Sequence, residues 1–182
     1  MSNAALVVAG AWAFAEATLW FIVPDVFAGF VVLFAPRRFS RTLGAVVVGG
    51  LLGALALTSL TAATGGISRL LVALPGITYA DLGQASVELQ AQGAVALLNG
   101  PLQGLPVKVY VHEAALLATP LPVLAAFVVL NRLERVGISL LLAMAVGSAL
   151  RRRIAQWPRL ALALYVGLWA AIYVAYYTMR PI

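Results

Sequence analysis

The sequence predicts an all-α polytopic membrane protein: one membrane domain over residues 1–182, built as an inverted repeat of two re-entrant helical hairpins plus about three transmembrane helices. Hydrophobic residues make up 63% of the chain and charged residues only 10%, whereas a soluble domain averages about 25% charged residues. Segments 42–68 and 160–179 carry no charged residue, and each reaches the roughly 20 residues that span a bilayer. The apolar residues run continuously and do not alternate, which argues against an outer-membrane barrel.

The net charge of +6 is concentrated in two arginine clusters and indicates topology, not nucleic-acid binding. Both clusters lie at the ends of apolar segments, where the positive-inside rule places cytoplasmic residues; they are Arg37, Arg38 and Arg41, and Arg151, Arg152, Arg153 and Arg159. The chain has no cysteine and a single histidine, so thiolate chemistry is excluded and a metal site is not expected. No cofactor is expected either. The N-terminus has no basic region before its apolar run, so this first segment is expected to remain in the mature protein.

The first apolar segment, 4–36, is predicted to be a re-entrant hairpin. It is too long for one span and too short for two, and it contains Glu16, Pro24 and Asp25. Pro24 blocks a straight helix, and interrupted backbone at membrane depth survives only where it is packed in protein or lines water. A carboxylate in hydrocarbon costs roughly 2.5–3.5 kcal/mol even on the lenient scale, so such residues usually face a cavity with a function.

The segment 43–63 is predicted to be a plain transmembrane helix. Gly49 and Gly53 form a GxxxG pair that allows another helix to approach closely. Packing within the chain is the favoured interpretation, and a homo-oligomer contact is the alternative. The polar segment 65–92 is predicted to be an extramembrane, partly helical connection on the side opposite the arginines.

The segment 93–119 is the second interrupted apolar stretch. Asn99-Gly100-Pro101 and Gly104-Leu105-Pro106 break it, and Lys108, His112 and Glu113 follow. Two Gly/Pro-interrupted hydrophobic segments in corresponding halves of a chain indicate a binding site at the bilayer midplane between inverted repeats.

Two alternatives are open for 120–150: one long helix with charges at mid-depth, or two short helices joined by a basic loop. The continuous helix is favoured because 136–150 is short for an independent span. It also places both arginine clusters on the cytoplasmic side. Arg132 would then lie roughly 18 Å from the start of the helix, near the bilayer centre. The C-terminal helix, 160–179, would cross outward with Tyr173, Tyr176 and Tyr177 at the far interface.

At these motifs the chain resembles the DedA family (VTT-domain, or SNARE-associated, membrane proteins), especially its small YqaA-type branch. The first half is similar to an acidic hairpin, with Phe14-Ala15-Glu16 followed by Pro24-Asp25. The second half is similar to a proline–lysine hairpin, Pro106-Val107-Lys108, and Asn131-Arg132-Leu133-Glu134-Arg135 resembles a Gly-Arg-x-x-Arg pattern. The resemblance covers most of 16–150 through short motifs. Gln103 stands where larger members have an arginine, and Asn131 replaces the usual glycine, which puts the substrate in doubt more than the fold.

The resemblance implies an inverted-repeat fold whose two hairpins meet at mid-membrane and a role in moving lipids between leaflets. Bacterial members return undecaprenyl phosphate to the cytoplasmic side, eukaryotic relatives scramble phospholipids, and proton coupling has been proposed. The implied partners are membrane lipids, a polyprenyl phosphate and protons.

Eight residues are candidates for the site. Lys108, Arg132, Arg135 and Gln103 are expected to bind substrate, and Glu16, Asp25, His112 and Glu113 to exchange protons. Arg132 and Arg135 share a helix face, and arginine binds phosphate with two parallel hydrogen bonds. Burial disfavours a charged carboxylate and a nearby cation favours it, so Glu16 and Asp25 could be poised for proton exchange.

Each candidate also has a structural interpretation. Asp25 could cap the helix after Pro24, and the two arginines could pair with Glu134 or with the hairpin acids only for stability, or lie in a solvated loop. His112 follows Lys108 by one turn and could relay protons, or be a plain interfacial residue. Glu113 could pair structurally.

The predicted function is a flippase that moves a lipid phosphate across the bacterial inner membrane, with a non-selective scramblase as the alternative. An enzyme is not expected, because no nucleophile beside a base and no metal motif is visible. A structural membrane protein that stabilises a partner complex through 44–53 is the third possibility.

Overall fold

A computed structural model describes residues 3–179 and, within that range, every side chain except those of residues 101 and 102. The described chain is 85% helical and contains no strand, which confirms the all-helical part of the predicted fold class. The elements in chain order are α1 (Ala4–Thr18), α2 (Asp25–Phe34), η1 (Pro36–Arg38), α3 (Phe39–Thr64), α4 (Ser68–Val72), α5 (Tyr79–Gln92), η2 (Gly93–Leu98), α6 (Gly100–Gln103), α7 (Val107–Leu116), α8 (Leu121–Ala149), α9 (Arg151–Gln156) and α10 (Pro158–Met179).

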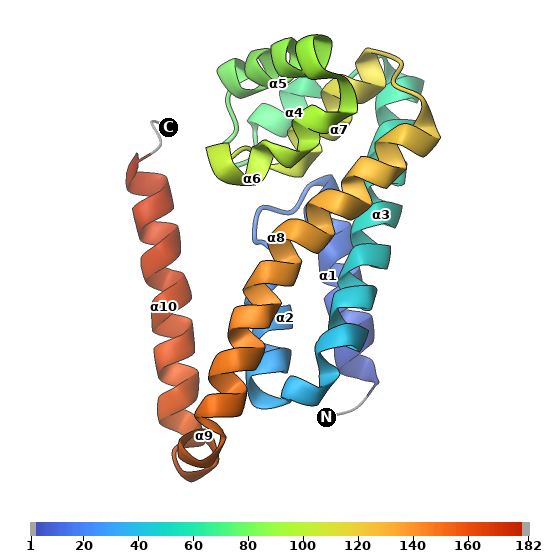
Figure 1. The fold of residues 1–182 in the computed structure, drawn as a ribbon. Coiled ribbons are helices and arrows are strands. Elements are labelled where there is room, and N and C mark those ends of the chain that lie inside the picture. The colour runs from blue at the N-terminus through green and yellow to red at the C-terminus, as the bar shows by residue number, and fades with distance from the viewer. Residues whose placement is uncertain (1–2, 180–182) are drawn as a thin grey trace.

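The first apolar segment folds as two helices that run in opposite directions (Figure 1). The connection between α1 and α2 ends at Pro24, the residue before α2, whose φ is −65°. Proline is tolerated at this position because the N–H groups at the start of a helix have no intrahelical partner. Trp12 closes the connection by donating from Nε1 to the carbonyl oxygen of Ile22, at 2.9 Å. The loop between α1 and α2 is therefore held in a defined conformation.

Helix α3 packs against α1 through its glycines. A Cβ on Gly49 would stand 2.0 Å from the carbonyl oxygen of Gly10, and one on Gly53 would stand 2.5 Å from the carbonyl oxygen of Phe14. Gly49 and Gly53 are both buried. The GxxxG pair thus serves packing within the chain, which was the favoured interpretation of the sequence.

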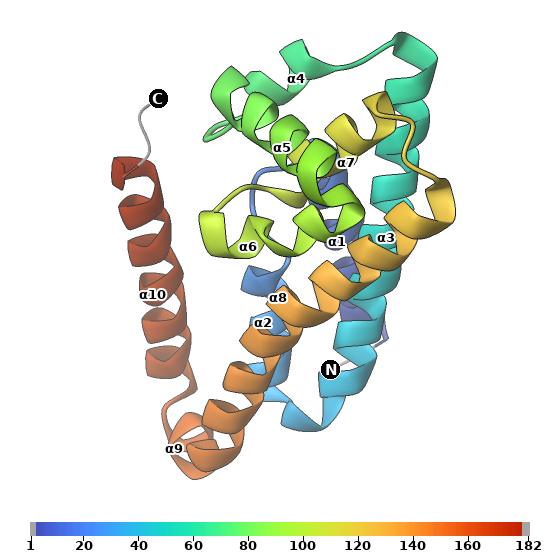
Figure 2. The same cartoon turned by 45° about the horizontal axis from the view of Figure 1, so that its top comes forward.

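Elements α4 to α7 form a cap at one end of the molecule (Figure 2). Helix α5 starts with a capping box in which Thr78 and Asp81 bond each other's backbone N–H groups. Gly104 ends α6 in the left-handed conformation, with φ 71°, a geometry that glycine adopts without steric cost. Pro106 then starts α7, so the second interrupted segment consists of three short elements: η2, α6 and α7.

Helix α8 is one continuous helix from Leu121 to Ala149, the first of the two alternatives that the sequence left open. At 1.5 Å per residue it is about 43 Å long, and Arg132 and Arg135 lie in its middle. Its C-terminal end abuts η1, since a Cβ on Gly147 would stand 2.3 Å from the carbonyl oxygen of Leu33 and 3.1 Å from Pro36.

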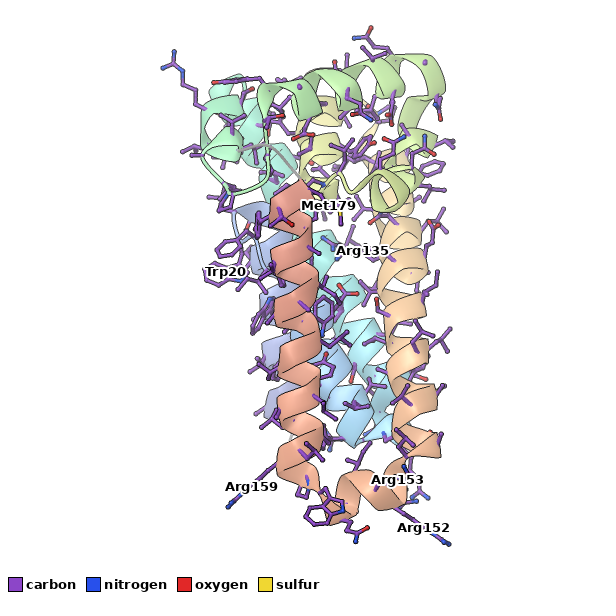
Figure 3. The ribbon with its side chains drawn as sticks, turned by 90° about the vertical axis from the view of Figure 1, so that its left-hand side faces the viewer. Trp20, Arg135, Arg152, Arg153, Arg159 and Met179 are labelled. Atoms are coloured by element: carbon purple, nitrogen blue, oxygen red, sulfur yellow. The ribbon has the colours of Figure 1, made fainter. Side chains whose placement is uncertain are left out.

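Both arginine clusters consequently lie at the same end of the molecule, opposite the cap. The turn between α2 and α3, which holds η1, and helix α9 both lie at the lower end in Figure 1, and Figure 3 shows Arg152, Arg153 and Arg159 at that end. The short helix α9 was not expected from the sequence.

Two described helices are long and apolar enough to cross a membrane, Pro36–Thr64 (η1 with α3) and Pro158–Met179 (α10). They correspond to the predicted helices 43–63 and 160–179 and start seven and two residues earlier, respectively. Helix α8 has the length but carries charges at its centre. None of the residues of α10 is buried, so this helix stands beside the rest of the fold (Figure 1).

Candidate functional site

A cavity of about 280 Å³ lies where the two interrupted segments, α8 and α10 meet. Its polar lining comes from four helices, α1, α2, α7 and α8: Glu16, Asp25, Lys108, Asn131, Arg135 and Ser139. Its aromatic lining comes mainly from α10: Phe21, Trp169, Tyr173, Tyr176 and Tyr177. This volume is just below the usual range of about 300–1,000 Å³ for small-molecule pockets and is enough for a small polar head group.

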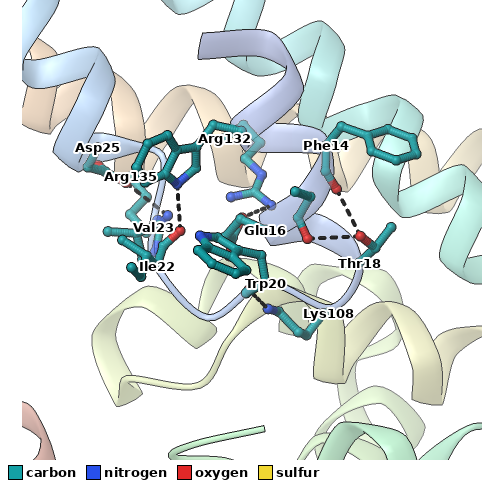
Figure 4. Close-up of polar contacts among 12 residues, drawn as sticks. Phe14, Glu16, Thr18, Trp20, Ile22, Val23, Asp25, Lys108, Arg132 and Arg135 are labelled. Atoms are coloured by element: carbon teal, nitrogen blue, oxygen red, sulfur yellow. Dashed lines mark hydrogen bonds and ion pairs between the residues drawn. The ribbon is translucent and has the colours of Figure 1, made fainter. Parts of the chain in front are cut away.

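Glu16 on α1 forms an ion pair with Arg132 on α8, with Oε2 2.7 Å from Nη2 (Figure 4). Glu16 is 3% exposed and Arg132 is 0% exposed, so both charges are removed from water. Gly50 of α3 makes room for the guanidinium, because a Cβ there would stand 2.8 Å from Nε of Arg132. The pair joins the first segment to the centre of α8.

Asp25, the first residue of α2, forms a second ion pair with Arg135, with Oδ2 3.0 Å from Nη2. Asp25 is 3% exposed, and the Arg135 side chain is 28% exposed. Arg132 and Arg135 lie three residues apart on one face of α8. Each therefore binds the carboxylate of a different arm of the first hairpin.

Lys108 of α7 brings the second interrupted segment to the same place. Its Nζ donates a hydrogen bond to the carbonyl oxygen of Trp20 in the α1–α2 connection (Figure 4). Lys108 also interacts electrostatically with Glu16. The structure thus gathers Glu16, Asp25, Lys108, Arg132 and Arg135 into one charged cluster, termed here the charge cluster.

The charge cluster is short of negative charge. Three cationic side chains face two carboxylates, so one positive charge is left uncompensated. Nε and Nη1 of Arg132 and Nε of Arg135 are buried with no hydrogen-bond partner among the described residues. A buried donor without a partner costs about 1–3 kcal/mol, and an anion or ordered water in the cavity would supply acceptors.

Asn131 joins the cluster to η2 by donating from Nδ2 to the carbonyl oxygen of Leu97, at 2.8 Å. The asparagine amide bridges α8 and the second segment where the resemblance predicts a glycine. No sequence pattern singled out this contact, because it joins residues that are distant in the chain.

Helix α10 contributes a row of aromatic side chains to the site, Tyr165, Trp169 and Tyr173, of which the sequence prediction named only Tyr173, at a membrane interface. The hydroxyl of Tyr165 donates to the carbonyl oxygens of Val26, at 2.8 Å, and Asp25, at 3.2 Å. The hydroxyl of Tyr173 accepts from the backbone N–H of Val23, at 2.9 Å. The spacing of Tyr165, Trp169 and Tyr173, four residues apart, puts them on one helix face and was the available signal.

His112 and Glu113 lie apart from the cavity and bind each other. His112 Nδ1 is 2.9 Å from Glu113 Oε1, and His112 Nε2 accepts from the backbone N–H of Ile67, at 3.1 Å. Because a backbone N–H only donates, Nε2 carries no proton and Nδ1 donates to the carboxylate. The fully buried ring fixes the corner between α3 and α4, one helical turn along α7 from Lys108 of the charge cluster.

Gln103 also lies outside the cavity, in a polar network on the cap. Its Oε1 accepts from Gln84 Nε2 at 2.7 Å, and Tyr110 donates to Glu88 Oε2 at 2.7 Å. Partial burial opposes ionisation of Glu88, but hydrogen bonds from Gln84 and Tyr110, with further ones from Gln103 and Asn99, outweigh it and lower the pKa of Glu88. This network ties α5 to α6 and α7.

Within residues 3–179, no three histidine or acidic side chains are grouped so that they could hold a metal ion. Comparison of the chain with known proteins gave no match to a family model, to a curated protein or to a solved structure. The site is therefore interpreted from its own geometry, and the DedA resemblance rests on the motifs alone.

Proposed function

We propose that this chain is a polytopic inner-membrane protein of the DedA type that moves a lipid phosphate, undecaprenyl phosphate in the first place, between the bilayer leaflets. The observation that carries the proposal is the uncompensated positive charge of a buried cluster that faces a cavity. Buried charges at membrane depth usually mark a substrate pathway. The choice of the polyprenyl phosphate comes from the resemblance.

In this proposal both interrupted segments are re-entrant and meet at the bilayer midplane, with α3, α8 and α10 crossing the membrane. The common position of the two arginine clusters supports this arrangement, because the positive-inside rule then puts both in the cytoplasm. Helices α4 and α5, the outer part of the cap, lie on the opposite side.

Arg135 and Lys108, which line the cavity, make the first contacts with the phosphate. An arriving phosphate competes with Asp25 and Glu16 for the cations, and a carboxylate that loses its partner takes up a proton. Proton uptake and release by Glu16 and Asp25 would reset the site. Arg132 lies behind Glu16 and acts by holding that carboxylate. His112, Glu113 and Gln103 carry no step here, because the structure has them outside the cavity.

Transbilayer movement of lipid in liposomes tests the proposal. Wild type, Lys108→Met and Arg135→Met are compared with fluorescent polyprenyl phosphate and fluorescent phospholipid side by side. Arg152→Met, an exposed arginine on α9, is the matched control for loss of one positive charge.

We expect wild type to move the polyprenyl phosphate and not the phospholipid. Both cavity variants should slow this movement at least about tenfold, and the control should leave it unchanged. Equal movement of both lipids would indicate the scramblase alternative. A well-folded protein that moves neither lipid would overturn the proposal and favour a structural role, although the GxxxG face that such a role would use is occupied by α1.

A further inference from the structure

The attachment of α10 to the rest of the fold includes hydrogen bonds from its tyrosine hydroxyls to backbone atoms. No residue of α10 is buried, yet its tyrosine hydroxyls bond backbone atoms of residues 23–26. A third hydroxyl, of Tyr176, donates to the carbonyl oxygen of Gly104 at 3.4 Å. The helix is thus fastened at the loops of both interrupted segments.

The backbone atoms that bond Tyr165 and Tyr173 belong to Val23, Asp25 and Val26. They therefore lie next to the Asp25 side chain, which forms the ion pair with Arg135. The N–H of Val23 precedes Pro24 and lies outside any helix, so Tyr173 supplies its partner. An unpartnered backbone N–H in an apolar environment is costly. Gly29 allows the approach of Tyr165, since a Cβ at Gly29 would stand 2.6 Å from its hydroxyl oxygen.

The helical backbone is interrupted between α9 and the N-terminal end of α10. Trp157, between α9 and α10, has φ −128° and ψ 60°, which are not helical, and Pro158 provides no N–H to continue α9. A rotation at this point would withdraw the aromatic wall of the cavity and release the hydroxyls from residues 23–26 together.

We propose that Tyr165 and Tyr173 are positioning residues of the site: they fix the backbone around Asp25, and displacement of α10 about Trp157–Pro158 opens the cavity sideways and loosens the Asp25–Arg135 pair. This opening would pass the chain of a lipid whose head group occupies the cavity. The transport role of the opening rests on the proposed function, whereas the link between α10 and Asp25 does not.

A distance measurement tests that link without any lipid substrate. The chain has no cysteine, so spin labels at Leu168→Cys on α10 and Leu52→Cys on α3, both more than half exposed, report the position of α10 in liposomes by pulsed electron spin resonance. Tyr165→Phe and Tyr173→Phe should each raise the ratio of long to short distances about fivefold. Asp25→Asn should raise it as well, because coupling is reciprocal.

The matched control is Tyr79→Phe, which removes a hydroxyl from an exposed tyrosine of α5 and should leave the distances unchanged. A double-mutant cycle distinguishes coupling to Asp25 from a general loosening of α10. The effect of Tyr173→Phe on the distance ratio should be smaller in the Asp25→Asn background than in the wild-type protein. Unchanged distances in both Phe variants, or strictly additive effects in the cycle, would overturn the inference. Loss of lipid movement with intact coupling would overturn only the proposed function.

Discussion

Gly50 of α3 lies directly against the guanidinium of Arg132: a Cβ at Gly50 would stand 2.8 Å from Nε and 3.4 Å from Cδ. The fully buried arginine thus occupies a space that one missing side chain creates. The contact connects α3, which the sequence predicted to be a plain transmembrane helix, to the charge cluster.

Gly50→Ala should slow lipid movement about tenfold, equivalent to about 1.4 kcal/mol, because the added methyl group displaces Arg132 from Glu16. Gly44→Ala is the control, since a Cβ at Gly44 meets no atom within 4 Å and both substitutions gain the same helix propensity. Transport rates in liposomes decide the matter. Equal rates for the two variants would show that the position of Arg132 is not critical.

Glu16→Gln should lower the free energy of unfolding by about 3–5 kcal/mol, because it leaves Arg132 buried without its counter-charge. Asp25→Asn should cost less, because the Arg135 side chain keeps 28% of its surface exposed. Unfolding in detergent micelles measures both. The double variant Glu16→Gln/Arg132→Met should recover most of the loss, and a double variant less stable than Glu16→Gln would contradict the assignment.

Gly49→Ala should prevent normal packing of α1 on α3. The new methyl group would stand 2.0 Å from the carbonyl oxygen of Gly10, and backbone atoms cannot move aside as a flexible side chain can. Overpacking typically costs about 1–3 kcal/mol. The yield of monodisperse protein on size exclusion should fall relative to Gly44→Ala, and a normal yield would mean that α1 is free to shift.

The cap should lose stability in acid through Glu88. Its pKa is lowered in the folded protein below the ordinary value of 4.5, so its contribution is complete above about pH 4.5 and is lost as the pH falls through the folded pKa. Protection of α5 amide hydrogens from exchange should decrease over that range. In Glu88→Gln the decrease in α5 amide protection with falling pH should be smaller than in wild type. An identical decrease in both proteins would assign the pH dependence to other groups.

Part of this architecture was predictable from local sequence. Pro24, the Gly104–Pro106 break and the charge-free stretches mark where helices start and end, because proline, glycine and hydrophobic length act on the backbone over a few residues. The predicted bounds of α3, α8 and α10 differ from the structure by only a few residues. The i, i+3 spacing of Arg132 and Arg135 likewise fixes their common face without any tertiary information.

Which side chains meet was decided by the tertiary structure. Lys108 and His112 are one turn apart on α7, yet Lys108 contacts the Trp20 carbonyl and His112 caps the α3–α4 corner. Helical periodicity defines a face but not the neighbour that packs on it, and the rise of about 6 Å over one turn is enough to place the two side chains against different neighbours. Likewise, helical periodicity places Tyr165 and Tyr173 on one face of α10 but does not show which backbone atoms their hydroxyls bond.

The sequence by itself determined that this chain is helical, rich in membrane-compatible segments, and carries acids and bases where apolar residues surround them. Only the fold decided that Glu16, Asp25, Lys108, Arg132 and Arg135 form one cluster, that Gln103, His112 and Glu113 stay outside it, and that α10 lines one side of the cavity. Local composition sets the cost of burying each charge, whereas its partner is set by contacts between residues far apart in the chain.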